Sequence, residues 1–224
     1  FGGKLLSAGG LGTHVVRPGT PGSIEDENWR LMHQALTDLS EEFEVLSARD
    51  IPGYLPRAES QASEALWIPN EGWMDPTVVL GYLDSLFHTL PNVRVVDNEA
   101  VEVRENGQSV NIIANEGIPS SFDKVVVAAG FRSLGLVASF LDRASGQPRI
   151  VSGEGVTLRL ELSANQQKSV IRTPNRGLAC GLYSAPYGPE IVVGASNSVR
   201  IRPTERAKVE SLRSILTMVS DELN

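Results

Sequence analysis

The sequence predicts a mixed α and β (α+β) fold with at least one sizeable antiparallel sheet, and three observations carry this prediction. Apolar residues recur every three or four positions in three stretches, which is typical of amphipathic helices. A β-rich pattern runs from residue 150 to residue 195. The run Val125–Ala129 is apolar without alternation, as in a strand buried on both faces of a parallel sheet.

The first half of the chain alternates between irregular and helical patterns. Residues 1–22 are rich in glycine and lack periodicity, and we expect residues 46–73 to be irregular because prolines 52, 56 and 69 interrupt them. A helix is predicted between these stretches from the spacing of Trp29, Met32, Ala35, Leu36, Leu39 and Phe43.

A second helix is predicted to begin at Asp75-Pro76, because a carboxylate suits the N-cap and proline suits the first helical position. Pro91 closes it. The side chains that we expect this helix to bury are Val79, Leu80, Leu83, Leu86 and Phe87.

Short strands are expected next. Val93–Val96 is one, and Ala100–Val103 and Val110–Ala114 flank Asn106-Gly107, which predicts a hairpin because this dipeptide readily adopts positive φ. The run Val125–Ala129 follows, and then a short helix around residues 134–141.

The pattern of the last third of the chain predicts four strands and a helix. The strands are Val156–Leu162, Ser169–Arg172, Leu178–Tyr183 and Glu190–Ala195. The helix begins near Thr204, and its apolar face holds Val209, Leu212, Ile215, Leu216 and Val219.

Composition excludes several classes of function. The chain has 224 residues, a net charge of −7 and a pI near 5.1, so no basic stripe predicts a nucleic-acid partner. No apolar run approaches the ~20 residues that span a bilayer. Cys180 is the one cysteine, which excludes an intrachain disulfide and favours a reducing, cytoplasmic location.

No metal site or nucleophile is predicted. His14, His33 and His88 lie far apart without a second ligand at suitable spacing, so a structural role is favoured for each. Cys180 lies in an apolar strand pattern and is expected to be a buried, inert thiol. The sequence has no Gly-x-Ser-x-Gly elbow, P-loop or complete Gly-x-Gly-x-x-Gly fingerprint.

Small residues end the apolar run at Ala128, Ala129 and Gly130. In open α/β sheets the carboxyl ends of strands are where nucleotides and cofactors bind. A core strand followed by a tight turn would give the same pattern, so the run alone leaves both interpretations open.

Three segments in order resemble one family. Leu6–His14 is similar to a small-residue loop that lies against a flavin. Glu71-Gly-Trp-Met-Asp-Pro76, continuing to Val125–Gly130, is similar to a family helix start and returning strand. Ile150–Glu154, Tyr183 and Ile191–Ser196 are similar to its "P-V-R-G-Q", "Y-x-x-P" and "L-V-x-G-A-T" blocks. Together they resemble the FAD-dependent D-amino-acid oxidase superfamily, and most of all its glycine/sarcosine oxidase branch.

The resemblance implies a substrate domain with a large mixed or antiparallel sheet, joined to part of a Rossmann-like FAD-binding α/β domain. Residues 1–22 and 92–148 would belong to the FAD-binding domain, and 23–91 and 149–224 to the substrate-binding domain. Tyr183 would face the substrate, although an ordinary sheet tyrosine is an equal alternative. The residues implied to contact FAD are Ser7, Ala8, Gly9, Gly10, Ala100, Ala129 and Gly130.

The implied activity is oxidation of the C–N bond of a small amino acid or amine, by hydride transfer to FAD and hydrolysis of the resulting imine. The family's N-terminal Gly-x-Gly-x-x-Gly unit and C-terminal FAD-binding blocks are absent from these residues, so we expect the segment alone to be inactive. No catalytic residue is assigned. The sequence does not determine the oligomeric state, and a homo-oligomer is one of the possibilities. Two alternatives remain: a flavin-free binding or assembly module, and a relative that oxidises a hydroxy acid.

Overall fold

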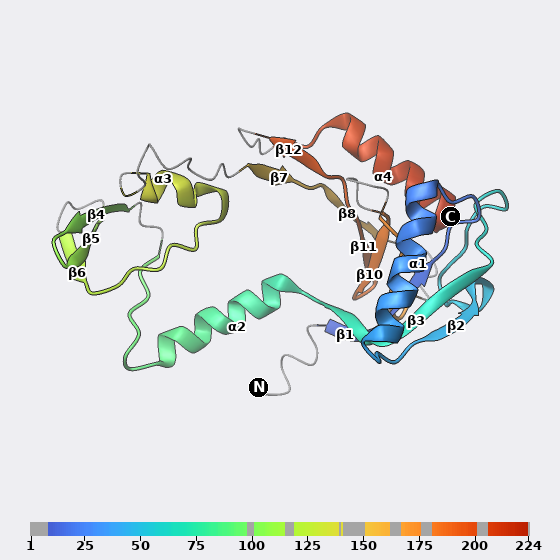
Figure 1. Ribbon diagram of the computed structural model, residues 1–224, viewed down its shortest axis with the longest axis horizontal. Helices are drawn as coiled ribbons and strands as arrows, with labels where there is room; N and C mark the ends of the chain where they lie inside the picture. The colour runs from blue at the N-terminus through green and yellow to red at the C-terminus, as the bar shows by residue number, and fades with distance from the viewer. Residues whose placement is uncertain are drawn as a thin grey trace. The chain divides into compact units, whose positions relative to one another are not determined.

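The computed structural model describes residues 9–97, 101–114, 119–138, 140, 151–161, 167–175, 181–200 and 206–223. The chain divides into two compact units (Figure 1). The larger comprises Phe1–Leu83, Gly153–Ser198 and Thr204–Asn224, and the smaller comprises Asp84–Ser152 and Val199–Pro203. The division groups residues 9–22 with the large sheet, whereas the resemblance implied an FAD-binding role for them; the functional domain assignment stays a prediction.

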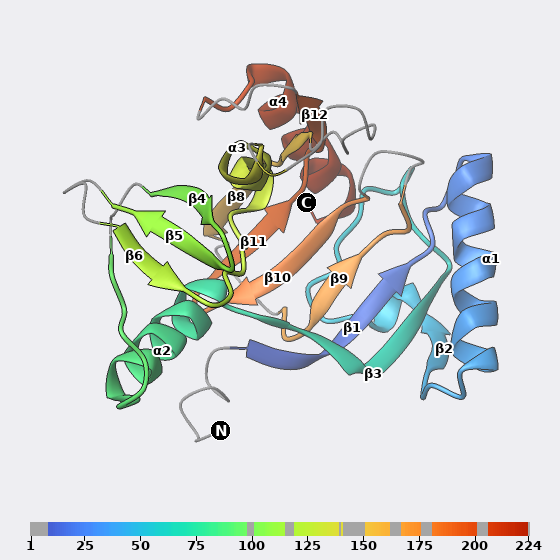
Figure 2. The same ribbon diagram turned by 60° about the vertical axis from the view of Figure 1, so that its left-hand side comes forward.

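A seven-stranded mixed sheet organises the larger unit, which confirms the predicted fold class (Figure 2). All its strand pairs are antiparallel except β1–β9, which is parallel. In spatial order the strands are β2 (Glu44–Ser47), β3 (Glu64–Met74), β1 (Gly9–Val16), β9 (Val170–Arg172), β10 (Tyr183–Tyr187), β11 (Glu190–Gly194) and β8 (Thr157–Glu161).

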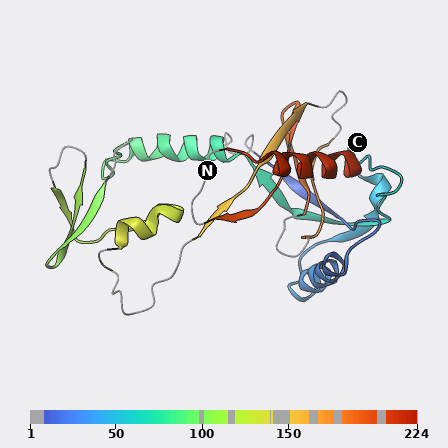
Figure 3. The same cartoon turned by 90° about the horizontal axis from the view of Figure 1, so that it is seen from above.

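Helices α4 (Val209–Glu222) and α1 (Ser23–Asp38) pack on opposite sides of this sheet (Figure 3). Ile215 of α4 is fully buried in one cluster with Val16, Ile191 and Val193. Trp29 of α1 is buried with Val15, Leu66 and Ile68. Because successive strand residues point to opposite faces, Val16 packs in the cluster under α4 and Val15 in the cluster under α1. The cluster under α1 draws only on β1 and β3, and this leaves the same face of β9, β10, β11 and β8 outside it.

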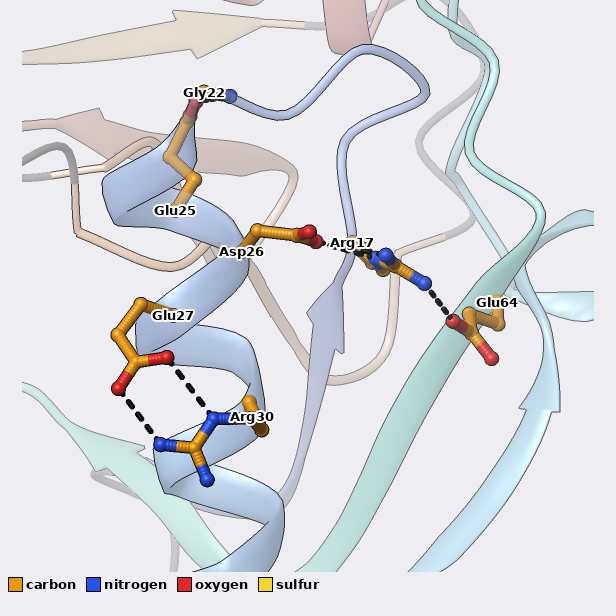
Figure 4. Close-up of polar contacts among 7 residues, drawn as sticks. All are labelled: Arg17, Gly22, Glu25, Asp26, Glu27, Arg30 and Glu64. Atoms are coloured by element: carbon orange, nitrogen blue, oxygen red, sulfur yellow. Dashed lines mark hydrogen bonds and ion pairs between the residues drawn. The ribbon is translucent and has the colours of Figure 1, made fainter.

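Charged residues fix the start of α1 (Figure 4). The Gly22 N–H donates to the Glu25 carboxylate at 2.7 Å, which satisfies one free backbone donor of the first turn. The Arg17 guanidinium bonds Asp26 of α1 at 2.7 Å and Glu64 of β3 at 2.6 Å. These two acidic partners raise the pKa of Arg17. The charged side chains neutralise one another, and their role is to hold the start of α1 against β3.

The prediction that residues 46–73 are irregular is wrong. They hold the second half of β2, the 3-10 turn η1 (Ala48–Asp50) and nearly all of the long strand β3. Pro69 is tolerated because the β1–β3 register shifts there: Leu11 pairs with Gly72, and Thr13 with Ile68. A proline that lies in such a bulge removes no ladder hydrogen bond.

Gly12 makes the bulge possible. Its φ is +98°, and a Cβ there would lie 1.9 Å from the Trp67 ring. Within the glycine-rich stretch that lacks periodicity, residues 9–16 therefore form strand β1.

Helix α2 (Pro76–Thr89) begins and ends as predicted, and the Thr77 N–H donates to the Asp75 carboxylate at 2.9 Å. The predicted burial is wrong: none of residues 76–89 is buried, and Leu80 and Phe87 are 64% and 44% exposed. An apolar spacing shows which face of a helix needs cover, but it does not identify what covers it.

The smaller unit contains the predicted hairpin of β4 (Glu102–Asn106) and β5 (Ser109–Ile113), extended by β6 (Pro119–Phe122). Gly107 adopts φ +64° in a two-residue loop with Gln108, since Asn106 pairs with Ser109. The short helix is α3 (Ser133–Val137), preceded by the 3-10 turn η2 (Gly130–Arg132). The strands β7 (Ser152–Glu154) and β12 (Ser198–Arg200) pair where the chain passes between the units.

Two predicted strands of the smaller unit are not observed. Val93–Val96 and Val125–Ala129 belong to no strand, and Val126 is 90% exposed. A strand exists only when a neighbour completes its ladder, and β4, β5 and β6 pair with one another.

The later elements follow the sequence pattern more closely. β8, β9 and β11 lie within one residue of their predicted bounds. β10 begins only at Tyr183, and residues 176–180 lie outside the described part of the chain. In the described ranges, no helix is long and apolar enough to cross a membrane.

Candidate functional site

The candidate site is the side of β9, β10, β11 and β8 that faces away from α4, which we call the open face. Along β10, Ser184 is fully buried, whereas its neighbours Tyr183 and Ala185 are half-buried. β11 alternates likewise: Ile191 and Val193 belong to the core under α4, and Val192 lies on the open face. The alternation therefore brings polar and aromatic side chains of several strands to one surface.

Tyr183 lies on this surface. It pairs with Arg172 of β9 on one side and with Gly194 of β11 on the other. A Cβ on Gly194 would lie 3.1 Å from the tyrosine ring, so the glycine makes room for the ring to lie over the strand. The predicted substrate-facing role of Tyr183 is compatible with this position and stays a prediction.

Arg172 and Glu71 form a bidentate ion pair beside Tyr183. The Arg172 Nε and Nη2 atoms lie 3.0 and 3.1 Å from the two Glu71 carboxylate oxygens, and Nη2 lies 3.9 Å from the Met32 sulfur of α1. The Arg172 and Glu71 side chains are 28% and 39% exposed. The pair is therefore fixed in orientation and open to solvent.

A second polar group lies where β10 and β8 approach the start of α2. The Arg159 guanidinium lies 4.1 Å from the centre of the Tyr187 ring. Burial alone would raise the pKa of Asp75, but hydrogen bonds from the Thr77 N–H and the Tyr187 side chain outweigh it and lower this pKa.

The opposite face of the sheet holds a buried polar network. His14 Nδ1 lies 2.8 Å from the Ser169 hydroxyl, and the His14 ring lies 4.5 Å from that of Trp67. Gln167 donates to the Ser184 carbonyl at 2.8 Å and accepts from the Ser184 hydroxyl at 2.7 Å. Burial lowers the pKa of His14 to about 4, so the imidazole is neutral near pH 7. His14 and Ser169 are only 7% and 6% exposed, which excludes them as a nucleophile and base for an external substrate.

The predicted FAD contacts divide into three groups. Ser7, Ala8 and Ala100 lie outside the described residues, as does Cys180. Gly9 and Gly10 begin β1, where a Cβ on Gly10 would lie 2.1 Å from the Trp73 ring; this packing alone requires glycine at position 10. Their contact with a flavin stays a prediction.

Gly130, next to Ala129 in the smaller unit, fits the close approach of a cofactor. It adopts φ +56°, and no atom of the described residues lies within 4 Å of the place where a Cβ would be. Backbone that is open on this side can be approached by a large planar group without displacing a side chain.

Sequence reasoning missed Arg172, Glu71 and Arg159. The strand pattern contained a signal for Arg172, since a residue that follows a buried Ile171 must lie on the other face of the sheet. Glu71 stood only as the first residue of the motif before the Asp75-Pro76 helix start, and no strand position was predicted for it because the bulge was not predicted. In the described ranges, no three histidine, cysteine or acidic side chains are grouped to hold a metal ion.

The family model for FAD dependent oxidoreductases (DAO) matches residues 11–222. The chain therefore belongs to this family, which confirms the resemblance stated from its motifs, and FAD is the family's cofactor. No curated protein sequence matches the chain significantly.

Solved structures share the fold. Glycine oxidase from Bacillus cereus ATCC 14579 matches with a TM-score of 0.74 and 18% identity, over 95% of this chain and 55% of that one. NikD, an unusual amino acid oxidase essential for nikkomycin biosynthesis, matches with 0.71 and 16%, over 96% and 57%. L-α-glycerophosphate oxidase from Mycoplasma pneumoniae matches with 0.73 and 16%, over 96% and 58%. The chain thus spans little more than half the length of these proteins.

Proposed function

We propose that this chain forms part of an FAD-dependent oxidoreductase that oxidises the C–N bond of a small amino acid or amine. The family match over residues 11–222 is the observation that carries the proposal. The open face supports it, because Tyr183 and the Arg172–Glu71 pair offer hydrogen bonds and both signs of charge to a small polar molecule.

Bound FAD supplies the chemistry that accepts a hydride from the carbon bearing the nitrogen, and water then hydrolyses the imine. The residues of this chain bind the cofactor and orient the substrate. Gly130, with Ala129 beside it, would hold the cofactor on the open side of its backbone. Tyr183 would wall the substrate with its ring while its hydroxyl hydrogen-bonds a polar group. No described side chain is assigned as acid or base.

Two alternatives have support of their own. The likeness to L-α-glycerophosphate oxidase favours a substrate oxidised at a carbon that bears oxygen. The packing of Trp73 on Gly10 accounts for one of the small residues without a flavin, as a flavin-free module would require. We further propose a small-molecule partner and, from the single cysteine, a cytoplasmic location.

Anaerobic addition of candidate substrates to the purified full-length flavoprotein tests the proposal. We expect one or more small amino acids or amines to bleach the visible flavin absorbance. Bleaching by hydroxy acids or glycerol phosphate alone would favour the first alternative. A full-length protein that neither retains nor takes up FAD would favour the second.

A further inference from the structure

We propose that the Arg172–Glu71 pair recognises the zwitterionic head of an α-amino acid, with Arg172 binding the carboxylate and Glu71 the ammonium group. The inference rests on the proposed function and deepens it, because it names the substrate class and two residues that select it. It is carried by the geometry of the pair, its exposure and its position opposite Tyr183.

Arg172 keeps donors for a ligand. Its Nε and Nη2 atoms bond Glu71, and among the described residues Nη1 has no hydrogen-bond partner. A guanidinium carries five N–H donors in one plane, so fixing one edge aims the remaining donors in a set direction. The Arg172 side chain is 28% exposed, and a carboxylate bound at Nη1 would leave both bonds to Glu71 in place.

Glu71 keeps acceptors in the same way. Each of its oxygens accepts one bond from Arg172, whereas a carboxylate offers about four lone-pair sites in all. Its side chain is 39% exposed. An ammonium group next to the pair would therefore find an acceptor that already carries a full negative charge.

The neutral charge of the pair determines which ligands fit. An anion alone gains hydrogen bonds from Arg172 but approaches the negative charge of Glu71 as well. A zwitterion matches both charges, whereas a hydroxy acid brings no cation of its own to Glu71. Discrimination of this kind comes from the unfavourable contact as much as from the favourable one.

Tyr183 places the pair on the predicted substrate surface. Directly opposed residues in antiparallel strands have Cβ atoms roughly 5 Å apart, so Tyr183 and Arg172 can contact one small molecule. A half-exposed ion pair contributes only about 0–1 kcal/mol to stability, and stability alone gives little reason for a bidentate pair here.

The test measures binding without turnover. 2-Aminoisobutyrate has no hydrogen on its α-carbon and cannot lose a hydride, and 2-hydroxyisobutyrate is its matched hydroxy acid. Their dissociation constants would be measured by calorimetry on the full-length flavoprotein. We expect the wild-type protein to bind the amino acid about tenfold more tightly or better.

The variants separate the two roles. Glu71→Gln should reduce the preference for the amino acid to about threefold or less, and Arg172→Lys should weaken both ligands about tenfold or more, because lysine lacks the planar fork. Arg30→Lys is the matched control. Arg30 forms a bidentate pair with Glu27 on α1, outside the open face, and its replacement should leave both constants unchanged.

A preference that survives Glu71→Gln, unchanged binding in Arg172→Lys, or wild-type protein that binds neither ligand would overturn the inference. Thermal unfolding of each variant shows that it is folded, and Glu71→Gln alone decides the ammonium contact if Arg172→Lys is unstable. If amino acids bleach the flavin but the variants bind like wild type, the inference fails and the proposed function stands. If no amino acid or amine bleaches it, the proposed function fails.

Discussion

Replacing Ile215 by alanine is expected to lower the free energy of unfolding by about 2–5 kcal/mol. Ile215 is fully buried and joins α4 to the cluster that contains Ile191 and Val193 of β11. The loss combines the transfer free energy of the missing methyl groups with the cavity that they leave. Chemical denaturation followed by tryptophan fluorescence measures it. The chain's three tryptophans (Trp29, Trp67 and Trp73) all lie in the larger unit.

Leu216→Ala is the control for this experiment. Leu216 is the next residue of the same helix and is 50% exposed, so its replacement should change stability by less than about 0.5 kcal/mol. Equal effects of the two substitutions would show that α4 does not pack on the sheet through Ile215.

Lowering the pH is expected to destabilise the protein through His14. Burial lowers the pKa of His14 to about 4 in the folded state, against about 6.5 in the unfolded chain. The unfolded state binds the proton more tightly, so the contribution of neutral His14 is fully present above pH 6.5. It falls as the pH drops toward 4 and is constant below that. The stability lost over this window is about 3 kcal/mol.

His14→Asn isolates this contribution, because asparagine is neutral and its side chain can reach Ser169 as Nδ1 does. Whatever its own stability, the variant should lose about 3 kcal/mol less than wild type between pH 6.5 and pH 4. Denaturation midpoints across this range measure the difference. Parallel pH dependences in the two proteins would contradict a buried, neutral His14.

Patterns that depend on local geometry were predicted correctly. The Asp75-Pro76 helix start, the hairpin at Gly107 and the strands β8, β9 and β11 needed only short-range rules. The strand predicted at Val125–Ala129 is not observed. An apolar run of this kind forms a strand only beside neighbouring strands, and it pairs with none of the described strands. At Pro69 the opposite error occurred, because an irregular segment was predicted and a strand is observed. A bulge at Gly12, 57 residues away, makes a proline acceptable in β3.

The sequence predicted one residue of the candidate site and missed the ion pair beside it, because the pair depends on contacts between distant segments. Tyr183 was identified from its motif, at the end of a predicted strand. The ion pair beside it joins Arg172 to a residue 101 positions away, on a strand that proline appeared to exclude. Such a pair follows from the register of β1, β3 and β9 together, which no single stretch of sequence specifies.

Ammonia release tests the proposed function most directly. Purified full-length flavoprotein would be reduced anaerobically with the amino acid or amine that bleaches it, and ammonia or the free amine would be quantified against the flavin reduced. Oxidation of a C–N bond followed by imine hydrolysis predicts one equivalent of released nitrogen per flavin. An oxidised product that forms with its nitrogen still attached, or reduction only by substrates that contain no nitrogen, would contradict this account.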